Sequence, residues 1–97
     1  MHRSDNNQTV EKLFEMVLKQ NGIWNTFLEQ KIVNNWKEIV GAKIAKSTTK
    51  IEISGRKLYL RVDSSVLRNE LLMLRSNIID IVNSKAGETI IDDVVIR

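Results

Sequence analysis

Apolar residues recur along the first half of the chain with the spacing of α-helices. In residues 9–20 they fall at Val10, Leu13, Phe14 and Val17, a spacing of i, i+3, i+4 and i+7 that gathers them on one face. This pattern predicts a helix with one buried face, ended by Gly22. A second stripe predicts a helix over residues 26–40 and one more helical turn after Gly41; its members are Leu28, Ile32, Trp36, Ile39 and Val40.

The apolar period then changes from 3.6 to 2. Ile51 and Ile53 alternate with polar residues, as do the apolar residues of 57–62, and Gly55-Arg56 lies between the two runs. Strict alternation on both sides of a turn predicts a β-hairpin with one buried and one polar face. The polar face carries Lys50, Lys57, Tyr59 and Arg61.

The last third of the chain predicts a long helix and a final strand. After Asp63 and Ser64, either of which can cap a helix, apolar residues repeat in steps of four and three over residues 65–85, and Gly87 can end that helix. Residues 90–96 indicate a strand. The order helix, helix, strand, strand, helix, strand predicts an α+β fold with the helices packed on one face of a three-stranded mixed sheet.

The length of the chain limits its organisation to one domain. We expect residues 1–8 to form a disordered tail and residues 9–97 to form a single domain, because 97 residues suffice for one core. No apolar run approaches the ~20 residues of a membrane span. Cysteine is absent, so no disulfide framework or thiolate metal site is expected, and a cytoplasmic location without membrane contact is favoured.

Positive charge is concentrated in the middle of the chain. The net charge is +3, but residues 43–75 hold eight basic and three acidic residues and so carry +5, which leaves −2 elsewhere. A basic centre can meet the phosphate backbone of a nucleic acid. A charged surface that is merely solvated is the alternative interpretation.

No catalytic constellation is visible, so we expect the protein not to be an enzyme. The single histidine, His2, lies in the predicted tail. Asp92 and Asp93 are adjacent in a predicted strand, so their side chains should point to opposite faces and cannot share a proton or a metal. The four glycines are scattered, and no metal-ligand spacing is present. No cofactor or metal is therefore expected.

Two blocks of the sequence resemble a known family. The first is Trp36-Lys37-Glu38-Ile39-Val40-Gly41 with Ile44-Ala45 and Ser47-Thr48; the second runs from Gly55 through Leu58-Tyr59-Leu60, Val62 and Ser64-Ser65 to Leu67, Glu70-Leu71 and Leu74. Together they resemble the DciA-like family. The resemblance implies a KH-like domain, binding to the bacterial replicative helicase, and binding to DNA. The G-x-x-G loop with which KH domains clamp a nucleic-acid backbone is absent, so any such contact must use another surface.

The resemblance implies a helicase-loading accessory protein, and with the basic centre of the chain it leads us to expect weak binding of single-stranded or junction DNA. Cations would neutralise phosphates, and the aromatic ring would stack on a base. The predicted nucleic-acid-binding residues are Lys43, Lys46, Lys50, Lys57, Tyr59, Arg61 and Arg68. An RNA-binding KH-like module and a pure protein-interaction domain are the alternatives, and a homodimer could form by pairing of sheet edges.

Overall fold

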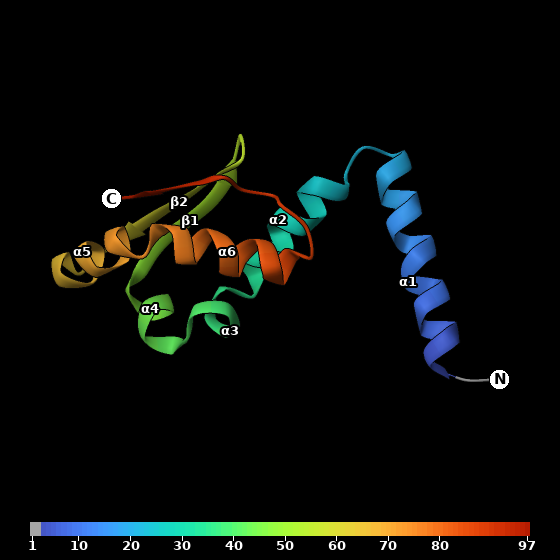
Figure 1. Cartoon of the computed structure of the whole chain (residues 1–97), viewed down its shortest axis with the longest axis horizontal. Coiled ribbons are helices and arrows are strands. Elements are labelled where there is room, and N and C mark those ends of the chain that lie inside the picture. Colours follow the sequence, from blue (N-terminus) through green and yellow to red (C-terminus); the bar gives the residue numbers. More distant parts are fainter. Residues whose placement is uncertain (1–2) are drawn as a thin grey trace.

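The computed structural model describes residues 3–97, with side chains from residue 9 onward, and contains one mixed sheet covered by helices on one face (Figure 1). The sheet order is β1-β2-β3, with β1 antiparallel and β3 parallel to the central strand. This arrangement confirms the predicted α+β class and is consistent with a KH-like domain. The elements are α1 (Arg3–Gln20), α2 (Trp24–Asn34), α3 (Trp36–Val40), α4 (Ala42–Ser47), β1 (Thr48–Ser54), β2 (Lys57–Val62), α5 (Ser65–Met73), α6 (Arg75–Ala86) and β3 (Asp93–Ile96).

The predicted hairpin is confirmed in both its strands and its turn. Gly55 and Arg56 have φ values of 56° and 63°, the combination of a type I′ turn, whose twist matches that of the flanking strands. Pairing of Ser54 with Lys57 and of Ile53 with Leu58 fixes the register. Alternate residues of β2 therefore point to opposite faces of the sheet.

The core lies between the sheet and the helices. Strand residues Leu58, Leu60 and Val62 meet side chains from the helices that cross behind them. Trp36 is buried as predicted, and its Nε1 donates a hydrogen bond of 3.1 Å to Thr48 Oγ1. The helical members of the buried cluster are Leu28, Ile32, Trp36, Leu67, Leu71, Ile78, Val82 and Ala86.

Two predicted helices are each broken into two. The helix expected over residues 26–40 begins at Trp24 and breaks at Asn35, whose Nδ2 donates to the carbonyl of Lys31 at 2.7 Å and so competes with the backbone ladder. The helix expected over residues 65–85 breaks at Leu74, whose N–H bonds the carbonyl of Leu71, only three residues back. This break allows α5 to contact β2 while α6 contacts α2 and α3.

The final strand is shorter than predicted. It begins at Asp93 rather than at residue 90, because the backbone of residues 90 and 91 bonds a side chain instead of a neighbouring strand. Asn83 Oδ1 accepts from the N–H groups of Ile90 and Ile91 at 2.9 and 3.1 Å, and Asn83 Nδ2 donates to the Ile91 carbonyl. Ile90 and Ile91 are buried without belonging to the sheet.

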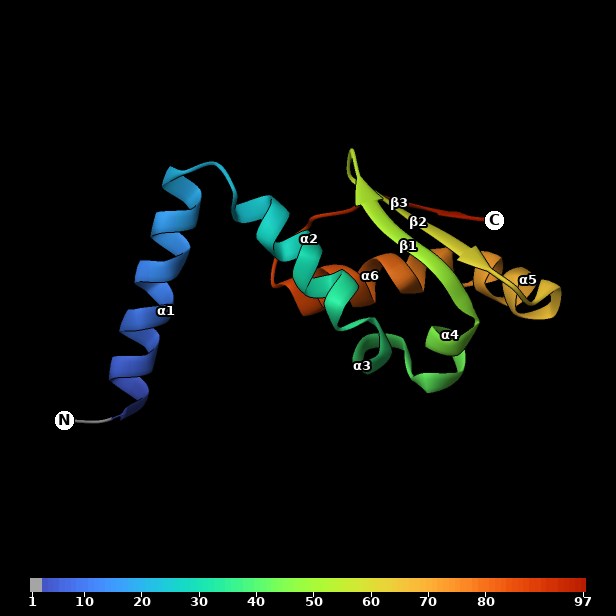
Figure 2. The same cartoon turned by 180° about the vertical axis from the view of Figure 1, so that it is seen from behind.

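Helix α1 differs most from expectation. It begins at Arg3 rather than near residue 9, since extending an existing helix costs much less than nucleating one. The expected disordered tail over residues 1–8 stays a prediction. Residues 1–2, including His2, lie outside the described residues. The face of Val10, Leu13 and Val17 that was predicted to be buried is exposed, because α1 projects away from the sheet (Figures 1 and 2).

Candidate nucleic-acid interface

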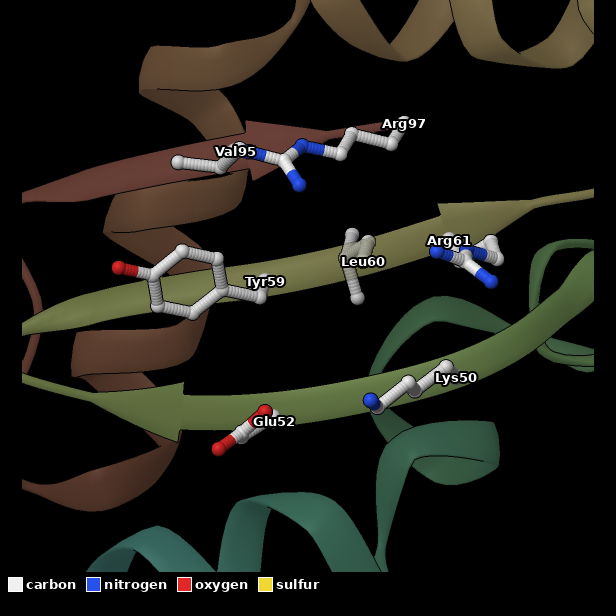
Figure 3. Close-up of a pocket in the computed structure, with 7 residues that line it drawn as sticks. All are labelled: Lys50, Glu52, Tyr59, Leu60, Arg61, Val95 and Arg97. Atoms are coloured by element: carbon white, nitrogen blue, oxygen red, sulfur yellow. The ribbon is translucent and has the colours of Figure 1, made fainter.

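The face of the sheet opposite the helices is uncovered. Figure 3 shows this open face, with the helices behind the strands. In β2 the exposed and half-exposed residues alternate with buried ones; β3 alternates likewise, and so does β1 from Lys50 onward, after a shift of register between Thr48 and Lys50. A shallow depression of about 140 Å³ lies on this face, lined by Lys50, Glu52, Tyr59, Leu60, Arg61, Val95 and Arg97.

Three cations form a row across the open face. Lys50 of β1 is the register partner of Arg61 of β2. Arg97 follows β3, and its N–H donates to the Leu60 carbonyl at 2.9 Å while its carbonyl accepts from the Val62 N–H at 2.8 Å. These two bonds place Arg97 beside Arg61. All three side chains are exposed, and none of them has an ion pair within the described part of the chain.

Tyr59 lies in the next row of the open face, two residues before Arg61. Its register partners are Glu52 on one side and Val95 on the other. Its ring is half-exposed and lies along the sheet among these neighbours (Figure 3). The sequence predicted an aromatic residue among cations here, and the structure brings Tyr59 together with the row of Lys50, Arg61 and Arg97.

Lys57 stands at the turn end of β2, away from the row. It pairs in register with Ser54 and with Asp93. The N–H of Val94 and the guanidinium of Arg75 both bond the Asp93 carboxylate and hold its pKa below the ordinary value. The neighbouring Asp93 carboxylate partly cancels the positive potential of Lys57. This lysine therefore adds less positive potential to the open face than the row of Lys50, Arg61 and Arg97 does.

Arg68 lies apart from the open face. It belongs to α5, and its guanidinium donates to the Val62 carbonyl at the end of β2 at 2.8 Å. Its Nε is buried without a hydrogen-bond partner among the described residues. The side chain thus joins helix α5 to the end of the central strand.

Lys43 and Lys46 belong to a second, separate basic surface. Both are exposed on α4, which lies on the helical side of the sheet (Figure 1). Lys46 shares a shallow hollow with Lys37 of α3. Lys37 and Arg97 were not predicted from the sequence. Lys37 precedes the basic segment of residues 43–75, and Arg97 follows the last strand, where no alternation continues to mark its face.

The two adjacent acids are used separately. Asp92 pairs with Arg56 of the hairpin turn at 3.1 Å, and Asp93 pairs with Arg75 at the start of α6. Among the described side chains, those of residues 9–97, no group of three or more histidine, cysteine, aspartate or glutamate residues is arranged to hold a metal ion. None of the helices within residues 3–97 has the length and apolar content of a membrane span.

Fold and site together define a small KH-like α+β domain with a cationic, uncovered sheet face. A family profile described as "Dna[CI] antecedent, DciA" matches residues 9–96, and the chain belongs to this family. It is also 36% identical over 62 residues to a UPF0232 protein of Corynebacterium glutamicum (strain R), a match that covers 64% of the chain and 35% of that relative. No solved structure matches the chain. The matched region thus spans about a third of the length of that relative.

Proposed function

We propose that this chain is a non-enzymatic replication accessory protein that binds the replicative helicase and holds single-stranded DNA on its open sheet face. Family membership supports the helicase part of the proposal. The observation that carries the DNA part is the row of Lys50, Arg61 and Arg97 beside the half-exposed ring of Tyr59.

The spacing of this face suits a single strand. Neighbouring strands of a sheet lie about 4.8 Å apart, so a row across three strands spans about 10 Å and can meet more than one phosphate. Tyr59 is two residues from Arg61, about 7 Å along the strand. A base that stacks on Tyr59 would therefore have its own backbone close to the cations, an arrangement that single-strand-binding proteins use.

The α4 surface offers a second, weaker contact. Lys43 and Lys46 are exposed on the helical side and can attract a strand that leaves the open face. Lys57 extends the positive field toward the hairpin turn. Arg68 would attract DNA through its charge alone, because its guanidinium already donates a hydrogen bond to the Val62 carbonyl.

The test is a titration of fluorescently labelled single-stranded DNA at several salt concentrations. Arg61→Ala/Arg97→Ala should weaken binding at least tenfold at low salt and reduce the salt slope by about 1.4, since each phosphate contact on a single strand contributes about 0.7. Lys31→Ala/Lys85→Ala is the matched control, because it removes two exposed lysines that lie elsewhere. If the two double variants lose DNA affinity equally, the affinity depends on net charge, and the open face is not the binding site.

Tyr59 supplies the specific element of the proposal. Tyr59→Ala should weaken binding of single-stranded DNA by about 1–3 kcal/mol, the value of base–aromatic stacking, and should leave the salt slope unchanged. Competition with RNA of matched sequence separates DNA binding from the alternative of an RNA-binding module.

Helicase binding is tested separately by co-purification with the replicative helicase of the same cell. Retention at high salt, together with no measurable nucleic-acid binding, would favour a pure protein-interaction domain. Edge pairing of two copies is the mode of self-association that the sequence suggested, with β1 and β3 as the edge strands of the sheet, and it is kept as an alternative to be tested.

A further inference from the structure

Helix α1 carries an apolar face that its own domain does not cover. Val10, Leu13 and Val17 are 64%, 55% and 52% exposed, although they share one face of the helix. Phe14 contacts α2 through an edge-on packing of its ring against Phe27, with centroids 5.2 Å apart. The rest of the face points into solvent. Contiguous exposed apolar surface of this kind marks an interaction site.

The corner between α1 and α2 is held in place by specific bonds. The N–H of Gly22, at φ 71°, bonds the Lys19 carbonyl and that of Ile23 bonds the Leu18 carbonyl, the two bonds of a Schellman motif. Lys19 Nζ lies 5.6 Å from the Trp24 ring, and Trp24 Nε1 donates to Glu88 at 3.2 Å. These contacts direct α1 away from its own domain.

The same chain has an apolar groove on its helical side. It has a volume of about 170 Å³ and lies between α3 and α6, where Leu74 and Ile81 remain 47% and 43% exposed. Leu74 and Ile81 are seven residues apart, as are Val10 and Val17. Seven residues of helix span about 10.5 Å, and Leu74 directly precedes α6, so the apolar stretch of α1 and the apolar wall of the groove have similar lengths.

The total surface of the chain is larger than a compact monomer of its size requires. A monomer of 11.2 kDa exposes about 5,700 Å², whereas this chain exposes 6838 Å². The difference of about 1,100 Å² exceeds the ~800 Å² that each partner buries in a standard interface. The radius of gyration, 15.5 Å, is likewise above the ~12.5 Å expected for this length.

We infer that two copies of this chain form a two-fold dimer in which α1 of each copy lies in the α3–α6 groove of the other. Helix and groove occur once per chain, so a reciprocal exchange covers both in both copies and closes without leaving a free end. A second copy of the chain always supplies both the helix and the groove. The open sheet face takes no part in the contact and stays free.

Engineered cysteines test the contact directly, because the chain has none of its own. Copies with Ile81→Cys are mixed with copies carrying Val10→Cys or Val17→Cys and are oxidised. We expect a disulfide-linked dimer between the two kinds of copy when the cysteine on α1 lies opposite Ile81, at either position 10 or position 17. Lys12→Cys, on the polar face of α1, is the matched control and should give little product. Equal yields from all three positions would contradict the proposal.

Sedimentation over a range of concentrations gives a second measure. Leu13→Gln/Val17→Gln and Leu74→Gln/Ile81→Gln should each weaken dimerisation at least tenfold, and mixing the two variants should restore association in part, since one intact helix–groove contact then remains. Glu11→Gln/Lys12→Gln is the control. The substituted residues are exposed, so circular dichroism should show an intact fold.

Three outcomes would overturn the inference. The unmodified chain could stay monomeric at every concentration. A dimer could persist in the α1 variant, which would point to sheet-edge pairing. The α1 variant could lose helicase binding with no change in self-association, which would make the helicase the occupant. DNA titration of the same variant separates this test from the proposed function, because the open face is intact.

Discussion

Trp36 is fixed by polar contacts as well as by packing. Its ring is buried, and its Nε1 donates to Thr48 Oγ1, which in turn donates to the Ile44 carbonyl at 2.7 Å. This chain of bonds joins the start of α3 to the middle of α4 and the start of β1. Sequence periodicity predicted that Trp36 is buried, but it could not identify Thr48 as the acceptor, because that pairing depends on the turn at Gly41.

Substitutions at Trp36 should separate packing from hydrogen bonding. Trp36→Phe keeps an aromatic ring in the core but removes the donor, and should lower the free energy of unfolding by about 1–2 kcal/mol. Trp36→Ala also leaves a cavity and should lower it by about 3–5 kcal/mol. Urea denaturation measures both values. Trp24→Phe, at a half-exposed ring, is the control, and an equal loss there would show that Trp36 has no special role.

Asp93 should make stability depend on pH at acidic values. The Val94 N–H and the Arg75 guanidinium favour its ionised form, so its folded-state pKa lies below 3.8, and its contribution to stability is present above that value. The contribution disappears as the pH falls through the folded-state pKa. Asp93→Asn should therefore melt at a lower temperature than the unmodified chain near neutral pH, and the two should converge as the pH falls through the folded-state pKa of Asp93.

A scan of melting temperature against pH tests this expectation. Asp80→Asn is the control, because the Asp80 carboxylate is exposed and has no ion pair in the part of the chain that the structure describes. A constant difference between Asp93→Asn and the unmodified chain at every pH would rule out the charge as its cause.

Among the secondary-structure elements, the segment between α6 and β3 has the Asn83 side chain as its hydrogen-bond partner, where a strand would have a neighbouring strand. This side chain bonds the backbone of both Ile90 and Ile91, and so directs the buried segment between α6 and β3. The sequence gives no sign of this role, since an asparagine in the last turn of a helix ordinarily faces solvent. The apolar residues at 90 and 91 consequently looked like the beginning of the strand.

Removal of the Asn83 side chain should cost more than an ordinary surface substitution. Asn83→Ala leaves the N–H groups of Ile90 and Ile91 without partners in a buried segment, and should lower the free energy of unfolding by about 2–4 kcal/mol. Asn77→Ala, on an exposed face of the same helix, should change it by less than about 0.5 kcal/mol. Chemical denaturation compares the two, and similar losses would contradict the proposed bridging role.

The accuracy of the predicted elements follows from the strength of their local signals. The hairpin was predicted correctly because alternation and a Gly55-Arg56 turn point to the same structure. The breaks at Asn35 and Leu74 were missed because neither position holds proline or glycine. Those breaks depend on side-chain and 3₁₀-type hydrogen bonds that form only when the helices pack on different neighbours.

At the scale of the molecule, the apolar stripe of α1 indicates the limit of sequence reasoning. The spacing of Val10, Leu13 and Val17 correctly predicted a helix with an apolar face, but not which surface covers that face. Such a stripe has the same spacing whether it is buried within one chain or between two chains. The part of the candidate site on the hairpin could be predicted from the sequence. The place of Arg97 beside Arg61 could not, because it depends on the parallel pairing of β3 with β2.

Hydrogen exchange should divide the chain into regions of different protection. Amides of α1 should exchange much faster than those of β2 and α6, because the main contact of α1 is with α2 while the other two lie against the core. If α1 docks on a second copy, its exchange should slow as protein concentration rises. If exchange at α1 does not depend on protein concentration, α1 does not dock on a second copy. If α1 is protected as strongly as β2, the predicted difference in protection between α1 and the core is wrong.

The central strand also determines which changes of length the hairpin can accept. One face of β2 supplies core residues Leu58, Leu60 and Val62, and the other supplies Tyr59 and Arg61. Inserting or deleting a single residue within this strand would exchange the two sets, which would place a guanidinium beneath the helices and leucines in water. Changes by two residues preserve the alternation. Among relatives of this chain, length variation within the strand should therefore occur in pairs, with single-residue changes confined to the loops.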